Sequence, residues 1–371
     1  MRIDWNRPQR NCARANSWAT RRVIDRHQTA QPELADSASD DQSLLGKRIL
    51  FFAVRYFGYE QHIIQELRRR GAEVDYLPDR PFNTPLMTAI TRYSRATIML
   101  FAERFYRRRL IEFGSRQYDL VFVINGQTMS RRFIRDLRRR MPKARFLFYI
   151  WDSMANKPKA KEILPYFDEC VTFDPAAAEQ YGMRMLPLFF APGFDPVTDE
   201  PDYDLSFIGT AHSDRFHIIS SIDRSLSPEV SRRWYLFLQA RWVFWVQKLL
   251  NPAFKRARFH DFGYIPLPFS EVQSVFRKSR IIVDTEHPRQ TGLTMRTFEA
   301  IGAGKKLITT NAHVKTYSFY DPRNIHIIDR VNPTIPDDFL RTPYCPLPSA
   351  EYYRYSLAGW IDALLGIKGK S

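Results

Sequence analysis

The stretch RQTGLTMRTFEAIGAGKKLITTN (residues 289–311) decides the fold, because a glycine turn, a short helix and a β-rich run follow one another in it. Arg296 and Glu299 lie at i+4 and i+7 from Gly292, so the three residues share one helical face. A glycine lets the backbone approach a ligand closely, and the free N–H groups at a helix start favour a phosphate. The pattern therefore predicts an anion site.

The two charged residues of this helix suit a nucleoside diphosphate. An arginine can balance the charge that develops on a departing diphosphate, and a carboxylate can accept hydrogen bonds from both hydroxyl groups of a ribose. The sequence leaves an alternative open, in which Arg296 and Glu299 form only an i,i+3 pair on the surface.

Outward from this stretch, short apolar runs alternate with helical segments, which is typical of βαβ units and a parallel sheet. The first series of expected strands is residues 48–54, 73–78, 118–125, 145–152 and 169–174. The second series is residues 203–210, 258–264, 280–286, 305–310 and 324–329. Proline and glycine at 189–202 indicate a hinge between the two series. The chain is therefore expected to be an α/β protein with two Rossmann-like domains in tandem.

Domain boundaries follow from this division. We expect a disordered basic tail over residues 1–46, or an over-long translation start. The first domain then covers 47–195, the second covers 196–350, and residues 351–371 form a C-terminal helix that packs back across the junction.

Composition limits the partners and the setting. The chain has 371 residues, a formal net charge of +16 and a pI near 9.8, which indicates an anionic partner such as nucleic acid, lipid headgroups or a phosphorylated substrate. Three cysteines without metal-ligand spacing indicate neither a disulfide framework nor a zinc site, and fit a cytoplasmic setting. Neither a secretory signal nor a membrane-spanning segment is expected.

Loops after parallel strands usually carry the ligand-binding residues of such folds. Gly209 and Thr210 end the first strand of the second domain, where backbone and hydroxyl donors would face the ligand. His212 and Arg215 follow in the same loop and could contact a phosphate or a transferred sugar, with His212 as a candidate catalytic residue. The alternative for His212 is a simply solvated loop histidine.

In the first domain, strand ends present Tyr56, Asn125 and Asp152. Asp152 is the best-placed carboxylate to take a proton from an acceptor hydroxyl, and Tyr56 and Asn125 are candidate substrate contacts. Asp152 could instead cap the helix expected after it. The segment DYD at 202–204 matches a DxD metal pattern, but it precedes a strand and is interpreted as a linker. No metal site is predicted.

Two stretches combine aromatic and basic residues, at 90–113 and 231–258, and both are expected to be helices. Ordinary packing of one face is the interpretation of the first. The second has tryptophans beside lysines and arginines, which suits either a protein core or a helix lying on an anionic membrane surface.

The segment at 292–311 resembles the donor-binding segment of GT-B glycosyltransferases. YDLSFIGTAHSDR (203–215) together with IIVDTEHPRQTGL (281–293) resembles the CgeB-like and capsular or lipopolysaccharide biosynthesis branch of that superfamily. The resemblance covers roughly residues 47–340. It implies two Rossmann-like domains that face a cleft, the acceptor on the first and a nucleotide-sugar on the second, with no obligatory metal and no cofactor.

Carried over residue by residue, the resemblance makes Glu299 the ribose ligand, and Arg296 with the Gly292 turn the diphosphate contact. Retaining members commonly place a second acidic residue eight positions before this glutamate, but that position is Thr291 here. Glu286 lies upstream at a different spacing. The stereochemical outcome therefore stays open.

The resemblance implies a glycosyltransferase that moves a sugar from a nucleotide-sugar to a cell-surface glycan or a lipid-linked acceptor. It would be cytoplasmic, with an anionic membrane surface at the inner face as a further partner. Two alternatives remain: an inactive nucleotide-binding relative, or a basic protein that binds nucleic acid. No helix-turn-helix, zinc-finger or RNP-like pattern supports the second alternative, so nucleic acid is not expected as a partner.

Overall fold

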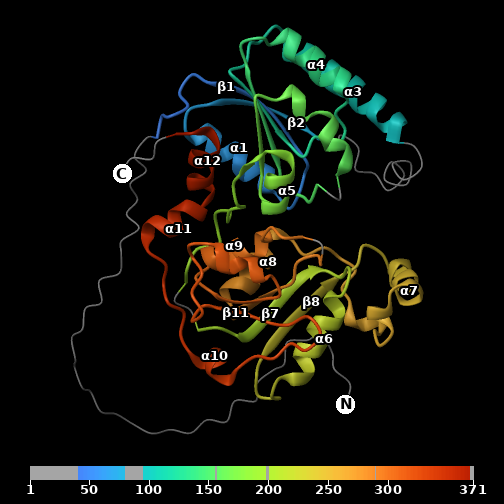
Figure 1. Ribbon diagram of the computed structural model, residues 1–371, viewed down its shortest axis with the longest axis vertical. Coiled ribbons are helices and arrows are strands. Elements are labelled where there is room, and N and C mark those ends of the chain that lie inside the picture. Colours follow the sequence, from blue (N-terminus) through green and yellow to red (C-terminus); the bar gives the residue numbers. More distant parts are fainter. Residues whose placement is uncertain (1–40, 80–94, 155–156, 198–199, 289, 368–371) are drawn as a thin grey trace, which may run out of the picture.

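The computed structural model describes residues 41–79, 95–154, 157–197, 200–288 and 290–367, which form two α/β halves stacked along the long axis (Figure 1). The N-terminal half comprises β1 (Arg48–Ala53), α1 (Tyr59–Arg69), β2 (Glu73–Pro78), α3 (Arg95–Glu112), β3 (Leu120–Ile124), α4 (Arg131–Arg140), β4 (Arg145–Ile150), β5 (Glu169–Thr172), α5 (Pro175–Tyr181) and β6 (Arg184–Met185). The C-terminal half comprises β7 (Tyr203–Thr210), α6 (Arg215–Ser225), β8 (Arg232–Phe237), α7 (Arg241–Leu250), α8 (Phe269–Arg277), β9 (Ser279–Asp284), α9 (Met295–Gly302), β10 (Lys306–Thr309), β11 (Ile325–Ile327) and α10 (Asp337–Arg341). The chain ends with α11 (Ser349–Tyr355) and α12 (Leu357–Leu365).

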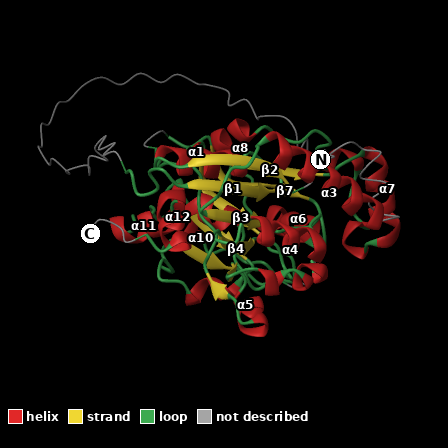
Figure 2. Cartoon of the chain, turned by 90° about the horizontal axis from the view of Figure 1, so that it is seen from above, coloured by secondary structure: helices red, strands yellow, loops and turns green. Residues whose placement is uncertain are grey.

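Each half contains one parallel sheet with helices on both faces (Figure 2). Strand β3 is buried along its whole length and β1 is buried after its first residue, which explains why both are continuous apolar runs. Successive side chains of β1 enter different cores: Phe51 packs with α1 and α12, whereas Phe52 packs with α3 and α4.

The strand orders are β2-β1-β3-β4-β5-β6 and β8-β7-β9-β10-β11. The strand order reverses between β1 and β3 in the first sheet and between β7 and β9 in the second. A ligand crevice forms beyond the carboxyl ends of the strands at such a point. The carboxyl ends of the two sheets face each other, because Tyr59 after β1 donates a hydrogen bond to Glu299 of α9, and Thr291 after β9 donates one to Asp174 after β5. The expected fold class, two facing Rossmann-like domains, is confirmed.

All but one of the expected strands are present, and the exception is residues 258–264. That segment contains a 3-10 turn, Phe259–Asp261, and a single bridge from Gly263 to Phe237. The second strand of the sheet is β8, which lies inside the stretch expected to be one helix at 231–258. The helix prediction is therefore wrong for residues 232–237 (RRWYLF), which form a strand paired with β7.

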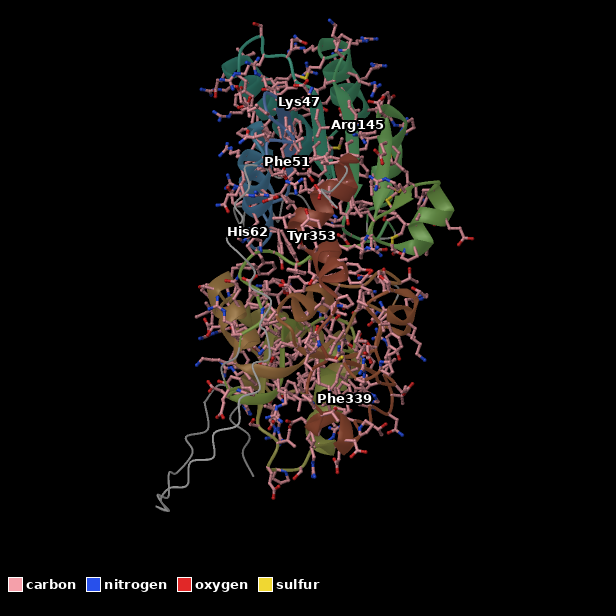
Figure 3. The ribbon with its side chains drawn as sticks, turned by 90° about the vertical axis from the view of Figure 1, so that its left-hand side faces the viewer. Lys47, Phe51, His62, Arg145, Phe339 and Tyr353 are labelled. Atoms are coloured by element: carbon pink, nitrogen blue, oxygen red, sulfur yellow. The ribbon has the colours of Figure 1, made fainter. Side chains whose placement is uncertain are left out.

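Two segments, around Phe190 and around residues 355–357, lie side by side and connect the domains. Phe190 of the first segment receives a hydrogen bond from Leu357 N and donates one to Tyr355 O. The region expected to be a hinge buries Phe189, Phe190 and Phe194 in a core that spans both domains, so it is a packed connection. In Figure 3 the label of Tyr353, on α11, lies where the two halves meet.

The last helix, α12, returns to the N-terminal sheet. Its Trp360 is fully buried, with its ring centroid 5.1 Å from that of Tyr149 and 4.6 Å from that of Phe189. Arg70 at the end of α1 pairs with Asp362 of α12. Residues 1–40 of the expected tail lie outside the described residues, but within 41–46 the buried Leu44 donates its N–H to Arg70 O at 2.9 Å.

Candidate functional site

Helix α9 carries the arginine that the sequence places against a diphosphate. Arg296 lies over the ring of Phe207 from β7, with 5.3 Å between the guanidinium carbon and the ring centroid. A Cβ at Gly209 would lie 3.4 Å from Arg296 Nη2, so glycine there leaves room for the guanidinium across the end of β7. Among the described residues, the buried Nε of Arg296 has no hydrogen-bond acceptor. A guanidinium with an unused N–H can take an anion.

Asp284, the last residue of β9, anchors the start of α9. Its side chain is 1% exposed and accepts hydrogen bonds from the hydroxyls of Thr294 at 2.7 Å and Thr297 at 3.0 Å. It lies 3.4 Å from Arg296 Nη1. Because Thr294 uses its hydroxyl for Asp284, no side chain caps the first turn of α9, although Thr297 N donates to Thr294 O at 3.1 Å.

A second arginine lies beside the first. Arg215, at the start of α6, is buried and donates from Nε to Thr285 O at 2.8 Å and from Nη1 to Thr210 O at 3.1 Å. Burial, and then the nearby charge of Arg296, lower the pKa of Arg215 to about 10. Two positive groups therefore share the point where the order of the C-terminal sheet reverses, and a bound anion would relieve their repulsion.

Glu299 lies one helical turn further along α9, as predicted, and it is buried. Its carboxyl accepts a hydrogen bond from the hydroxyl of Tyr59, the first residue of α1 in the other domain. Burial raises the pKa of Glu299 to about 8. A ribose that binds this carboxyl would have to replace the tyrosine hydroxyl. Arg296 and Glu299 therefore do not form the surface pair that the sequence left open as an alternative.

Gly292 provides a close approach, but its neighbour is protein. A Cβ at this position would lie 2.6 Å from the ring of Phe173 and 3.0 Å from the Phe173 carbonyl oxygen. The adjacent Thr291 donates its hydroxyl to Asp174. The turn that was expected to contact a diphosphate therefore joins the two domains in this structure, and Thr291 contributes through its hydroxyl.

His212 lies in the loop after β7 with its Nδ1 2.8 Å from the hydroxyl of Ser213 and its ring 5.8 Å from that of His287. Burial, followed by the charges of Arg215 and His287, lowers the pKa of His212 to about 3. The imidazole is therefore neutral near pH 7. It can donate a hydrogen bond to a sugar or phosphate oxygen, but such a low pKa makes it a weak proton acceptor.

Two candidates in the N-terminal domain lie at the junction. The side chain of Tyr56 is 48% exposed overall, but its hydroxyl lies among Arg296, Glu299, Arg215 and Asp152. Loss of water around the hydroxyl, before the influence of these charges, raises its pKa. Asp152 thus lies on the N-terminal side of the same charged group.

The carboxylate of Asp152 accepts from Ser153 N at 2.9 Å and pairs with Lys157 at 3.2 Å. The helical turn that follows begins at Pro158 and has Lys157 as its N-cap residue, so the alternative role of Asp152 as a helix cap is wrong. Asn125 is buried with a φ of 68° and accepts from Trp151 N at 3.2 Å. Its side chain holds the end of β3 against the end of β4.

Comparison with solved structures finds a similar architecture, whereas the two sequence comparisons find no match. No family model matches the chain, and no curated protein matches it in sequence. Among solved structures, the chain is similar to the crystal structure of Anabaena HepE in complex with UDP-glucose, with a TM-score of 0.50 and 9% identity. The match covers 86% of this chain and 98% of that one. At this identity the likeness concerns the fold.

The DYD segment lies at the opposite end of β7 from this site. Asp202 pairs with Lys278 at 3.0 Å, and Asp204 accepts from the N–H and the hydroxyl of Ser231, both at 2.9 Å. Within the described residues, no group of three or more His, Cys, Asp or Glu side chains is placed to hold a metal ion. Tyr203 and Asp204 belong to β7, so the interpretation of DYD as a linker is wrong for these two residues.

Three residues of the site escaped the sequence analysis: Asp284, Tyr59 and Arg330. Arg330 holds two loops together, because it pairs with Asp214 at 2.9 Å and with Glu286. Thr310 also donates a hydrogen bond to Glu286, at 2.6 Å. The Glu286 carboxylate is therefore engaged by residues of its own domain. Asp284 could have been found as a carboxylate at a strand end, but neither Tyr59 nor Arg330 carries a local signal.

Proposed function

We propose that this protein is a glycosyltransferase that transfers a sugar from a nucleotide-sugar to a glycan acceptor. The observation that carries the proposal is the pair Arg215 and Arg296 at the carboxyl ends of β7 and β9, with an unused N–H on Arg296 and an uncapped helix start beside it. A diphosphate supplies the acceptors and the charge that this arrangement lacks. The UDP-glucose complex of a protein with a similar fold supports the choice of donor.

In the proposed reaction, an acceptor hydroxyl oxygen bonds to the anomeric carbon as the bond from that carbon to the diphosphate breaks. The electron pair of the broken bond goes to the departing phosphate oxygen, where Arg296 and Arg215 balance the charge. For a transfer that inverts the anomeric centre, Asp152 takes the hydroxyl proton. His212, uncharged, donates a hydrogen bond to the donor, and Glu299 binds the ribose.

The N-terminal side of the junction suits a carbohydrate acceptor. Tyr56 and Phe57 are exposed large aromatic residues, and their ring centroids lie 4.6 Å apart. The ring of Trp151 lies 6.3 Å from that of Tyr56. Such a cluster offers apolar faces on which the C–H face of a sugar ring can stack. A cell-surface glycan or its lipid-linked precursor is the acceptor class that we propose.

The first test is nucleotide binding. We expect one of UDP, GDP and CDP to raise the melting temperature of the full-length protein selectively, in EDTA and without added magnesium. Glu299→Ala should weaken binding of that nucleotide by about 1–3 kcal/mol, the usual cost of leaving a buried hydrogen-bonding partner unpaired. The exposed Glu179→Ala serves as a control that should bind as the wild type does.

No stabilisation by any of the three diphosphates would reject the proposed function. Binding that requires magnesium would contradict the proposal that Arg215, Arg296 and the start of α9 balance the charge of the diphosphate. Binding without transfer to any glycan acceptor would favour the inactive relative, and tight binding of RNA or DNA in place of nucleotides would favour the basic nucleic-acid-binding protein.

We further propose that the enzyme works on the inner face of an anionic membrane. In the described part of the chain, no helix is long and apolar enough to cross a bilayer. Helix α7, however, projects from one side of the C-terminal half (Figure 1) with Trp242 61% and Trp245 63% exposed. Val246, Leu249 and Leu250 are also exposed and continue the stripe at helical spacing. The other tryptophan of this stretch, Trp234, is buried in β8.

The second test removes the stripe. Phe244, on the opposite face of α7, is buried, so changing Trp242 and Trp245 to serine should leave folding and nucleotide binding intact. Sedimentation with anionic vesicles in low salt should fall severalfold, because the tryptophans supply the apolar area that enters the interface. Unchanged sedimentation, or unfolding of the double variant, would contradict the membrane proposal.

A further inference from the structure

A cavity of ≈ 510 Å³ opens on the C-terminal domain between α6 and the 3-10 turn η3 (Pro252–Phe254) that follows α7. None of the candidate site residues lines it. Its lining includes four cationic side chains: Arg224, Lys255, Arg256 and Arg258. All four of these side chains are exposed. The cavity therefore collects positive charge outside the proposed active site.

The charge of this cavity is not balanced within the protein. Among the described residues, none of the four cations forms a salt bridge, and Arg224 donates to the hydroxyl of Ser221 at 2.9 Å. Asp223 also lines the cavity, but it pairs with Arg232 at 2.9 Å and accepts from Trp234 Nε1 at 2.8 Å.

The second carboxylate in the lining, Asp261, accepts a hydrogen bond from Arg258 N at 2.7 Å, and burial raises its pKa. Ser220 adds a neutral donor. Its hydroxyl oxygen is buried in the lining and has no hydrogen-bond partner among the described residues. Cationic side chains with an unused hydroxyl suit the oxygens of a phosphate.

The segment that supplies most of the basic lining of the cavity packs against α7. Phe244 of α7 packs on Phe259 with ring centroids 5.6 Å apart, and Lys248 donates to Ala257 O at 2.6 Å. Three of the four basic lining residues, Lys255, Arg256 and Arg258, thus belong to the segment that immediately follows the helix. If α7 lies at the acyl boundary of a bilayer, this segment lies at the level of the headgroups.

We propose that this cavity binds the phosphate of an anionic lipid headgroup while the tryptophans of α7 enter the bilayer beside it. The inference rests on the proposed membrane attachment. Basic residues are attracted to an anionic membrane in general, and each residue near the membrane surface contributes about 1 kcal/mol. The proposed cavity adds a defined binding site to this attraction. The cavity would select phosphate-bearing lipids and hold the enzyme in one orientation.

The test uses the full chain and a short-chain phosphatidylglycerol kept below its micelle concentration, titrated by calorimetry. Arg256→Gln with Arg258→Gln should weaken binding of this lipid at least tenfold. Arg135→Gln with Arg139→Gln, the same charge change on the exposed side of α4, should leave it unchanged. Ser220→Ala, a smaller change at a buried atom, should weaken binding without affecting the melting temperature.

Other outcomes would overturn the proposal. Equal loss in the α4 control would mean that total charge matters and the cavity does not. Equal affinity for inorganic phosphate and for the lipid would make the cavity a site for a soluble anion. Trp242→Ser with Trp245→Ser should keep short-chain lipid binding while losing vesicle binding; if vesicle binding persists, the α7 proposal fails and the titration still decides the cavity.

Discussion

Replacing Arg296 with alanine should lower the turnover number for sugar transfer by about 10²–10³-fold, the usual cost of removing one group that stabilises developing charge. The Michaelis constant for the donor should change much less, because the arginine contributes most when the diphosphate departs. Phe207 holds the guanidinium from one side, and Asp284 lies 3.4 Å from it. Initial rates over a range of donor concentrations separate the two constants.

Two further variants make the Arg296 test specific. Arg296→Lys should recover only part of the rate, because an ammonium group lacks the planar fork that binds a diphosphate through two bonds. Arg277→Ala, an exposed arginine on α8 of the same domain, should turn over as the wild type does. A folded Arg296→Ala variant with an unchanged turnover number would remove this residue from the proposed mechanism.

Replacing Glu299 with glutamine should make folding stability less dependent on pH. Burial raises the pKa of Glu299 from 4.5 to about 8, so the folded state favours the protonated acid. This contribution is complete below pH 4.5 and is lost as the pH rises to about 8, because the unfolded chain then releases a proton that the folded state retains. Glutamine does not titrate and keeps the buried amide neutral throughout.

The two proteins should therefore unfold with similar free energies near pH 5, and the glutamine variant should be more stable near pH 8. The difference should reach a few kcal/mol, since one pKa unit corresponds to about 1.4 kcal/mol. Urea unfolding at several pH values measures it, and Glu179→Gln, on the exposed side of α5, should follow the wild type. Parallel curves for Glu299→Gln and wild type would show that this carboxyl is ionised in the folded protein.

The structure also explains why the second domain was harder to interpret than the first. Strands such as β1 and β3 are buried on both faces, so their sequences are apolar without interruption and identify themselves. Strand β8 begins with two arginines and continues with mostly aromatic residues. It forms a strand because its backbone pairs with β7. A short run of six residues carries too little periodicity to exclude a helix.

By itself, the sequence determined the class of fold and the helix that carries Arg296 and Glu299, because hydrophobic period, glycine turns and i,i+4 spacing act over a few neighbouring residues. The tertiary structure alone decided what these residues face. Tyr59 contacts Glu299, which lies 240 positions later in the chain. Phe173 contacts Gly292, which also lies more than a hundred positions later. Burial, and with it the pKa of Glu299, depends on such distant contacts, and local sequence patterns carry no record of them.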